Sequence, residues 1–492
     1  MDNRKRNKKA EVSPEVVQKP TEPKKGTLKG KSDQKSPTKI SPNHESNLLK
    51  FASTFSKIIP TSFKVKHLVL LPTLAFLQII VYYFYLQKTE RIMTERSSFL
   101  EQQLKPDEAA HRGDYRALYK FQKSSTYDQV QQEDLTVVTQ CSVNNLHYLI
   151  DMSARWQGQI SVAVFTPKND AIITLYAINA IRRCFPDVRD LVTFSIVWPT
   201  NKGPIFEENP PAGLSSPECS EVYQALKSIP GQNYAKTSIP YPHNTLRNVA
   251  RYELNTKLMF LLDIDTVPAR GSREQFLHFA QKRDLFGEGA HLIENTVYVT
   301  PAFEVLEDVE PPADKTGLLN LLESERIRPF HNETCWYCHK TTRYEDWIQV
   351  PQENQLAISY EVDWEQSWEP YYISLTNIPE HDERFKQYGY DRISQICELY
   401  MADYRFFVLN NLFTVHQGYK RLGGFHMEKN IENRKNFLIF EDQFQPDMQS
   451  KYPDSNRTCR QRESWTSRDG RAQVRININD HLKNLQKRNI AK

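Results

Sequence analysis

The chain has 492 residues, of which 25% are charged and 11% aromatic, a globular composition with room for one large core or two smaller ones. The net charge of +4 is unevenly spread, because residues 1–66 hold 16 Lys or Arg against 6 Asp or Glu. The remainder is therefore net acidic. An acidic body gives no support to nucleic-acid binding, whose electrostatic footprint is basic, so we expect no nucleic-acid partner.

An uncharged apolar stretch of 19 residues, 68–86, follows this basic segment. As a helix it would reach roughly 28 Å, about the thickness of a bilayer core. Lysines precede it and charges of both signs follow it, so the positive-inside rule places residues 1–66 in the cytosol as a disordered tail. We therefore expect a single-pass type II protein with a transmembrane signal-anchor helix at 67–87. A cleaved signal peptide or a buried core helix is the alternative, but no small-residue cleavage site follows.

The rest of the chain divides into three predicted parts. Residues 88–134 are mostly polar with a thin apolar stripe, and we interpret them as a luminal stem, with a first helix of the folded domain as the alternative. Residues 135–459 form the folded domain. Residues 460–492 are a polar C-terminal tail.

From residue 135 the periodicity alternates between strands and helices. Runs of apolar and β-branched residues predict strands at 135–139, 160–166 and 191–198, and amphipathic spacing predicts helices at 146–156 and 171–184. This succession favours an α/β domain with a mostly parallel sheet covered by helices. Ligands of such sheets bind at the carboxyl ends of the strands.

A helix is predicted next at residues 244–254, with Asn244 as its N-cap. Arg247 and Arg251 lie one turn apart on it, and with Asn248 they are candidates for binding the phosphates or base of a nucleotide. A solvated basic face is the alternative.

The following apolar run, 258–262, predicts a buried strand that ends in Asp263 and Asp265. Side chains two residues apart in an extended chain point to the same side, so both carboxylates face one place while Ile264 turns to the core. The two carboxylates repel each other unless a cation joins them. Oxygen ligands suit Mn²⁺ or Mg²⁺, which would keep positions open for diphosphate oxygens. Carboxylates of a surface turn are the alternative.

Two further groups of residues lie nearer the C-terminus. Trp368, Glu369 and Tyr371 belong to an aromatic segment that suits a sugar-binding surface or, equally, a core. Asp382 and Glu383 precede a helix and offer a general base for an acceptor hydroxyl. A last strand is predicted across 405–416 and places His416 at its end, where it would complete a metal site or be structural.

All seven cysteines follow the predicted anchor, which suits an oxidising lumen. For the Cys335–Cys338 motif, a structural disulfide is favoured over a redox motif or half a zinc site, although the sequence does not supply its pairing. Cys397 lies on the apolar face of a predicted helix and is our candidate for the odd, free thiol. Asn332 and Asn456 begin Asn-x-Thr sequons and are predicted N-glycosylation sites.

Several of these segments resemble one glycosyltransferase family. It contains the Golgi beta-1,4-glucuronyltransferase of dystroglycan glycosylation and the second transferase domain of the matriglycan-synthesising enzyme. The resemblance runs in order through residues 135–459 and is closer to the single-domain glucuronyltransferase. The segments that carry it are Leu246-Arg-Asn-Val-Ala, Phe260-Leu-Leu-Asp-Ile-Asp-Thr-Val-Pro, Trp368-Glu-Pro-Tyr, Asp382-Glu-Arg-Phe-Lys-Gln-Tyr-Gly-Tyr-Asp-Arg-Ile and Val415-His-Gln-Gly-Tyr-Lys.

The resemblance implies a GT-A fold, Golgi residence, Mn²⁺ and a UDP-glucuronate donor. The implied acceptor is a beta-xylose-terminated O-mannosyl glycan on a glycoprotein such as dystroglycan, glycosylated in a beta-1,4 linkage. Asp263 and Asp265 would hold the metal, with His416 as a further ligand. An alpha-linked donor and a beta-linked product imply inversion, with Asp382 as the base and Glu383 as the alternative. An inactive membrane-anchored lectin of the same fold, or a transferase using another UDP-sugar, is the competing hypothesis.

Overall fold

The computed structural model describes residues 74–88, 108–167, 170–201, 203, 212–237, 239–423 and 428–459. The predicted cytosolic tail, the first part of the predicted anchor, residues 89–107 of the predicted stem and the C-terminal tail lie outside these ranges. Residues 74–88 form a helix with largely exposed side chains. Within the described ranges, no helix combines the length and the apolar character needed to span a bilayer. Residues 1–87 and 88–492 are separate units, and the second holds the sheets described below.

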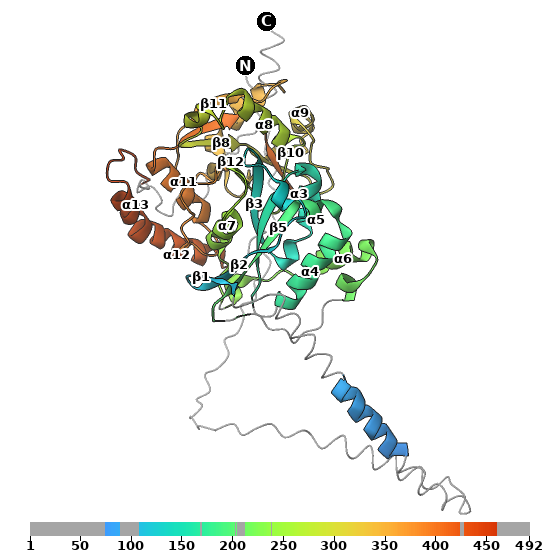
Figure 1. Cartoon of the computed structure of the whole chain (residues 1–492). Helices are drawn as coiled ribbons and strands as arrows, with labels where there is room; N and C mark the ends of the chain where they lie inside the picture. Colours follow the sequence, from blue (N-terminus) through green and yellow to red (C-terminus); the bar gives the residue numbers. More distant parts are fainter. Residues whose placement is uncertain are drawn as a thin grey trace, which may run out of the picture. The chain divides into compact units, whose positions relative to one another are not determined.

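Ten described strands make one mixed sheet in the order β1-β2-β5-β4-β3-β6-β12-β8-β13-β11 (Figure 1). In chain order they are β1 (Ala110–Arg112), β2 (Tyr115–Gln122), β3 (Leu135–Ser142), β4 (Ile160–Phe165), β5 (Val192–Pro199), β6 (Leu258–Leu261), β8 (Thr296–Thr300), β11 (Ile358–Val362), β12 (Tyr371–Leu375) and β13 (Arg405–Leu409). A smaller sheet has the order β10-β9-β14-β7. Its strands are β7 (Thr266–Pro268), β9 (Ala302–Val305), β10 (Ile327–Pro329) and β14 (Thr414–Gln417).

The direction of the strands divides the large sheet. Strands β5, β4, β3 and β6 are parallel neighbours, as the alternating strand and helix pattern predicts. Strand β12 then runs antiparallel to both β6 and β8, and β1, β2 and β11 also pair in antiparallel fashion. The predicted parallel arrangement therefore holds for β5, β4, β3 and β6 and for the β8–β13 pair, whereas the sheet as a whole is mixed. Periodicity identifies a strand but does not encode its direction.

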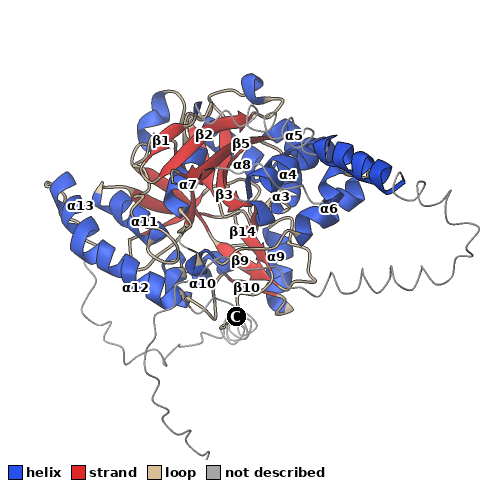
Figure 2. Cartoon of the chain, turned by 90° about the horizontal axis from the view of Figure 1, so that it is seen from below, coloured by secondary structure: helices blue, strands red, loops and turns tan. Residues whose placement is uncertain are grey.

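Helices cover both faces of the large sheet. Figure 2 shows α4 and α6 on one side of the strands and α11, α12 and α13 on the other, and Figure 1 agrees. The helices are α3 (Tyr148–Trp156), α4 (Asp170–Cys184), α5 (Pro186–Leu191), α6 (Cys219–Ser228), α7 (His243–Arg251), α8 (Ser272–Lys282), α9 (Lys315–Glu323), α10 (Tyr344–Gln349), α11 (Asp391–Met401), α12 (Lys429–Ile439) and α13 (Gln445–Lys451), with a π-helical turn, η10 (Phe440–Phe444), between the last two.

Strand β6 shows why the sheet needs cover on both faces. Leu258 and Phe260 pack into one apolar cluster with α3 and α4, whereas Met259 and Leu261 pack into another with α7 and α11. Because successive side chains of a strand point to opposite faces, four consecutive apolar residues require two cores. The carboxylates that follow β6 are thus fixed by a strand that is buried on both sides.

Three boundaries differ from the sequence prediction. Strand β2 pairs with β5, so the folded domain begins before residue 135 and includes part of the predicted stem. The predicted strand 405–416 is two strands in different sheets, β13 and β14, because the chain turns between Leu409 and Thr414. Helix α7 begins at His243, so Asn244 is not its N-cap. The Asn244 side chain instead donates to the carbonyls of Asp382 and Asp391.

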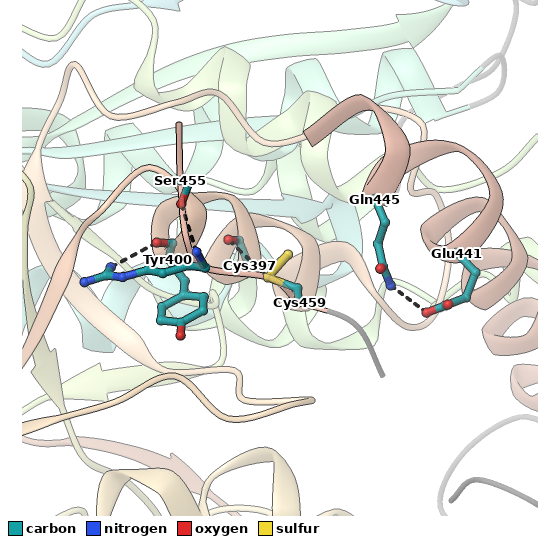
Figure 3. Close-up of a disulfide and its surroundings, with 7 residues drawn as sticks. Cys397, Tyr400, Glu441, Gln445, Ser455 and Cys459 are labelled. Atoms are coloured by element: carbon teal, nitrogen blue, oxygen red, sulfur yellow. Dashed lines mark hydrogen bonds between the residues drawn. A yellow bond between two sulfur atoms is a disulfide. The ribbon is translucent and has the colours of Figure 1, made fainter. Parts of the chain in front are cut away.

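The structure pairs six cysteines. The disulfides are Cys184–Cys219, Cys335–Cys338 and Cys397–Cys459, and Cys141 is free and buried. Cys397 is therefore not the free thiol. Figure 3 shows it bonded to Cys459, which follows α13 in the chain. Burial on an apolar helix face suits half of a buried disulfide as well as a free thiol, and the pattern around Cys397 alone does not separate the two.

Candidate active site

A cleft of about 880 Å³ opens at the carboxyl ends of β3 and β6. The chain proceeds from β3 to β4 to β5 in one direction and then places β6 on the other side of β3. Ligands of open α/β sheets bind where the strand order reverses in this way. Gln140 and Ser142 from the end of β3 line the cleft, as do Asp263 and Asp265, which follow β6.

The two aspartates share the cleft but have different partners. An Asp263 oxygen accepts a hydrogen bond of 2.9 Å from the Tyr371 hydroxyl, and the same carboxylate is ion-paired with Arg392. An Asp265 oxygen lies 3.1 Å from His416 Nε2 and 3.2 Å from Lys420 Nζ. Ile264 between them is buried in the core, as predicted. The carboxylates therefore lie at one place, each held by side chains from later in the chain.

These partners keep both carboxylates ionised. Burial alone would raise the pKa of Asp263, but the guanidinium groups of Arg392 and Arg247 outweigh it and lower the pKa. Burial likewise opposes ionisation of Asp265, and His416 and Lys420 hold its pKa well below the ordinary value. A divalent ion or a diphosphate entering the cleft would meet charged groups already in place.

The donor set suits part of a metal shell. His416 Nδ1 lies 2.7 Å from the Gly418 carbonyl, so it carries the proton, and in a neutral ring Nε2 then directs a lone pair at an Asp265 oxygen. A cation at this point would be bound by the Nε2 lone pair and by the Asp265 oxygen. Among the described residues, no three His, Cys, Asp or Glu side chains are placed to hold one metal ion. The residues present thus fit a site whose remaining ligands come from a bound substrate or water.

Of the three predicted nucleotide-binding residues on α7, the structure brings one to the cleft. Arg247 lines it, with Nη1 2.7 Å from an Asp391 oxygen. Arg251 instead donates to the carbonyls of Thr376, Ile378 and Pro379. Asn248 bonds the backbone of His381 and the Glu383 carboxylate. These two side chains hold the loop after β12 and do not line the cleft.

Neither predicted base lines the cleft. Asp382 is ion-paired with its neighbour Arg384, with Nη2 2.6 Å from a carboxylate oxygen. Glu383 is ion-paired with Arg112 and accepts a hydrogen bond of 3.0 Å from Thr245. Both carboxylates are thus engaged in fixing the loop between β12 and α11.

Of the three predicted acceptor-binding residues, only Glu369 lines the cleft. Trp368 is fully buried and donates through Nε1 to Thr342 Oγ1 at 3.2 Å, so it cannot stack on a sugar. Tyr371 is also buried, and its hydroxyl bonds Asp263.

Sequence reasoning missed several cleft residues. Arg392 and Lys420 neutralise the two aspartates, and Tyr337 and Tyr388 add aromatic rings to the wall. Asn144, just after β3, also lines the cleft. The rule that ligands bind at strand ends would have found Asn144, whereas the others come from segments whose proximity only the fold reveals.

A family model described as "Glycosyl-transferase for dystroglycan" matches residues 134–453. The chain belongs to this family. Beta-1,4-glucuronyltransferase 1 of Mus musculus is 35% identical over 353 residues, which are 70% of this chain and 82% of that protein. The Danio rerio protein of the same name is 36% identical over 66% of this chain and 75% of its own length. This chain is therefore a glycosyltransferase.

More distant relatives resemble only parts of this transferase. The human xylosyl- and glucuronyltransferase LARGE1 is 27% identical over 65% of this chain and 36% of its own length. Among solved structures, GalNAc-T7 with UDP, GalNAc and Mn²⁺ is 8% identical, covering 66% of this chain and 51% of that one. Its TM-score of 0.32 is too low to equate the two folds.

Proposed function

We propose that this transferase moves glucuronate from UDP-glucuronate to a beta-xylose-terminated O-mannosyl glycan on a glycoprotein such as dystroglycan, forming a beta-1,4 linkage with inversion. The observation that carries the proposal is the position of Asp263 and Asp265 in one cleft at the point where the strand order reverses, with His416 Nε2 3.1 Å from an Asp265 oxygen. The identity to glucuronyltransferases supports the donor, and the family description supports the acceptor.

The charges along the cleft fit a nucleotide sugar. Gln140 and Ser142 at the end of β3, and Asn144 just after it, offer polar groups to a nucleoside. Lys420 and Arg392 lie next to the aspartates, where a diphosphate would meet them. Asp265 and His416 would hold Mn²⁺ or Mg²⁺, with Asp263 close by. Such an ion would offset the negative charge that develops on the departing UDP. Lys420 and Arg392 would act in the same sense, because half-buried Lys420 and buried Arg392 would lie beside the leaving group.

We further propose that the transferase is a single-pass type II Golgi membrane protein with its catalytic domain in the lumen. The apolar stretch 68–86, the position of the cysteines and the three disulfides support an oxidising lumen. Asn456 is exposed, as a glycosylated side chain must be, and Asn332 is half-buried. A full-length protein that fractionates with cytosol and carries no N-glycan would contradict this topology.

The decisive experiment is a transfer assay with the purified chain, a beta-xyloside acceptor and a panel of UDP-sugars. We expect product from UDP-glucuronate, loss of product with EDTA, and recovery when Mn²⁺ is added back. Product from UDP-xylose or UDP-N-acetylglucosamine instead would overturn the donor assignment. Binding of glycans without turnover of any donor would favour the lectin hypothesis.

A further inference from the structure

Glu369 lies on the wall of the cleft. It lies between buried Trp368 and the first residues of β12, and its backbone N–H donates to the Cys338 carbonyl at 2.8 Å. Its side chain lines the same cleft as Asp263 and Asp265. Because its neighbours on both sides are anchored, its carboxylate has little freedom to leave the cleft.

The three aspartates of the cleft all have partners. Asp263 pairs with Arg392, Asp265 with Lys420, and Asp391 with Arg247. In the described part of the chain, the Glu369 carboxylate makes neither a hydrogen bond nor an ion pair within these distances. A half-buried carboxylate with unused acceptor positions is suited to receive a proton from a substrate.

The surroundings of Glu369 favour a proton acceptor that works near neutral pH. Burial raises its pKa to about 7, and the nearby charges of Asp391 and Asp263 add to this effect. Arg392 and Arg247 act in the opposite direction. In contrast, the pKa of Asp391 is lowered to about 2, because Arg247 and His243 outweigh its burial. Carboxylates of one cleft with such different pKa values are suited to different roles.

Two tyrosines flank Glu369. Tyr337 and Tyr388 line the same cleft as Glu369. Burial, followed by the charge of Glu369, raises the pKa of both phenols. Tyr337 is 40% exposed and belongs to the short turn closed by the Cys335–Cys338 disulfide. Aromatic faces bind the apolar face of a pyranose, while a few polar groups fix its hydroxyls. This corner of the cleft therefore has the chemistry of a sugar subsite.

We propose that Glu369, flanked by Tyr337 and Tyr388, forms the subsite for the acceptor sugar and takes the proton from the attacking hydroxyl. The hydroxyl oxygen forms the new bond to C1 of the donor sugar as its proton passes to Glu369. The bond from C1 to the phosphate oxygen breaks, and its electron pair leaves with UDP. The proton on Glu369 then passes to solvent. This assignment rests on the proposed function and replaces Asp382 and Glu383 as the base.

The test is the pH profile of kcat/KM for Glu369→Gln. The wild-type enzyme is expected to gain activity with rising pH through about 7, where Glu369 loses its proton. Glu369→Gln should lower kcat by about 100-fold or more and remove this acid limb, with UDP affinity unchanged. Near pH 8 the melting temperature of Glu369→Gln should equal or exceed that of the wild type, because a carboxylate with a raised pKa destabilises the fold when it is ionised.

Glu365→Gln is the matched control. Glu365 lies four residues earlier, is about half exposed and pairs with Lys340, so the same chemical change there should leave the pH profile intact. An acid limb that survives in Glu369→Gln, or that disappears in Asp382→Asn instead, would overturn the assignment. A wild-type enzyme that transfers no sugar from any donor would show failure of the proposed function itself.

A second measurement tests the aromatic wall. Tyr337→Ala should raise the KM for a beta-xyloside by about tenfold, which corresponds to about 1.4 kcal/mol, and leave the KM for the donor unchanged, since the variant loses the ring on which the acceptor stacks. Tyr337→Phe should retain most of the acceptor affinity. An unchanged acceptor KM in Tyr337→Ala would remove Tyr337 from the subsite.

Discussion

Asp265 is the side chain on which binding of the proposed divalent ion would depend, because one of its oxygens faces both His416 and Lys420. Asp265→Asn keeps the shape and removes the charge. We expect the transfer rate to fall by about 100-fold or more. We also expect Mn²⁺ to increase the UDP affinity of the wild type but not that of Asp265→Asn. Calorimetric titration of UDP with and without Mn²⁺ measures the second effect independently of turnover.

Asp308→Asn provides the control for Asp265→Asn. Asp308 is exposed, and its ion pair with Arg326 spans 3.7 Å at the surface, so its charge should matter little. If Asp265→Asn binds UDP with the same dependence on Mn²⁺ as the wild type, Asp265 is not a metal ligand.

At the residue scale, the sequence predicts some features of the site and not others. The positions of Asp263 and Asp265 follow from local rules, since a buried strand followed by Asp-x-Asp puts both carboxylates at one strand end. Their partners do not, because Arg392 and Lys420 lie more than a hundred residues away. Asp382 shows the converse error. Its residue type suits a base, but its carboxylate is ion-paired with Arg384, two residues further along the chain.

At the element scale, α7 is predicted correctly as a helix, but the sequence does not predict which of its side chains reach the cleft. Arg247 and Arg251 are one turn apart, yet only Arg247 reaches the cleft, and Arg251 turns to the loop after β12. Helical spacing shows which side chains share a face but not what that face meets. Strand direction likewise cannot be predicted from the apolar pattern. Strand β12 has an ordinary apolar pattern, yet it runs antiparallel to β6.

The contacts of Arg251 predict a structural effect. Its buried guanidinium donates to three carbonyls of the loop 376–379. Arg251→Ala leaves them without these donors, so we expect a loss of about 2 to 3 kcal/mol of unfolding free energy. The affinity of the folded variant for UDP should be unchanged. Denaturant titration and calorimetry measure the two quantities.

Arg405→Ala is the control for Arg251→Ala. Arg405 is mostly exposed and pairs with exposed Glu361, and such pairs contribute about 1 kcal/mol or less. Weaker UDP binding by folded Arg251→Ala would return Arg251 to the nucleotide site.

At the scale of the whole molecule, the C-terminal segment completes the cleft. Helix α12 supplies Asn433 and Phe437 to the cleft wall, whereas η10 and α13 pack into a third apolar cluster with α11. That cluster ends at the Cys397–Cys459 disulfide, and Figure 3 shows the disulfide beside the chain around Ser455. Periodicity can indicate a helix, but it does not show that this segment returns to the cleft.

The Cys397–Cys459 disulfide should therefore affect both stability and the cleft. It closes a separation of 62 residues, for which loop entropy predicts about 4 kcal/mol of stabilisation. The double variant with both residues changed to Ser should unfold at lower temperature, be cleaved sooner by protease within 440–459, and show a raised KM for the donor because α12 is less firmly held.

The double variant Cys184→Ser with Cys219→Ser is the matched comparison. That disulfide closes 35 residues between α4 and α6, so its loss should lower stability without changing the donor KM. Equal donor KM values in the two double variants would show that the C-terminal disulfide stabilises the fold without positioning α12 at the cleft.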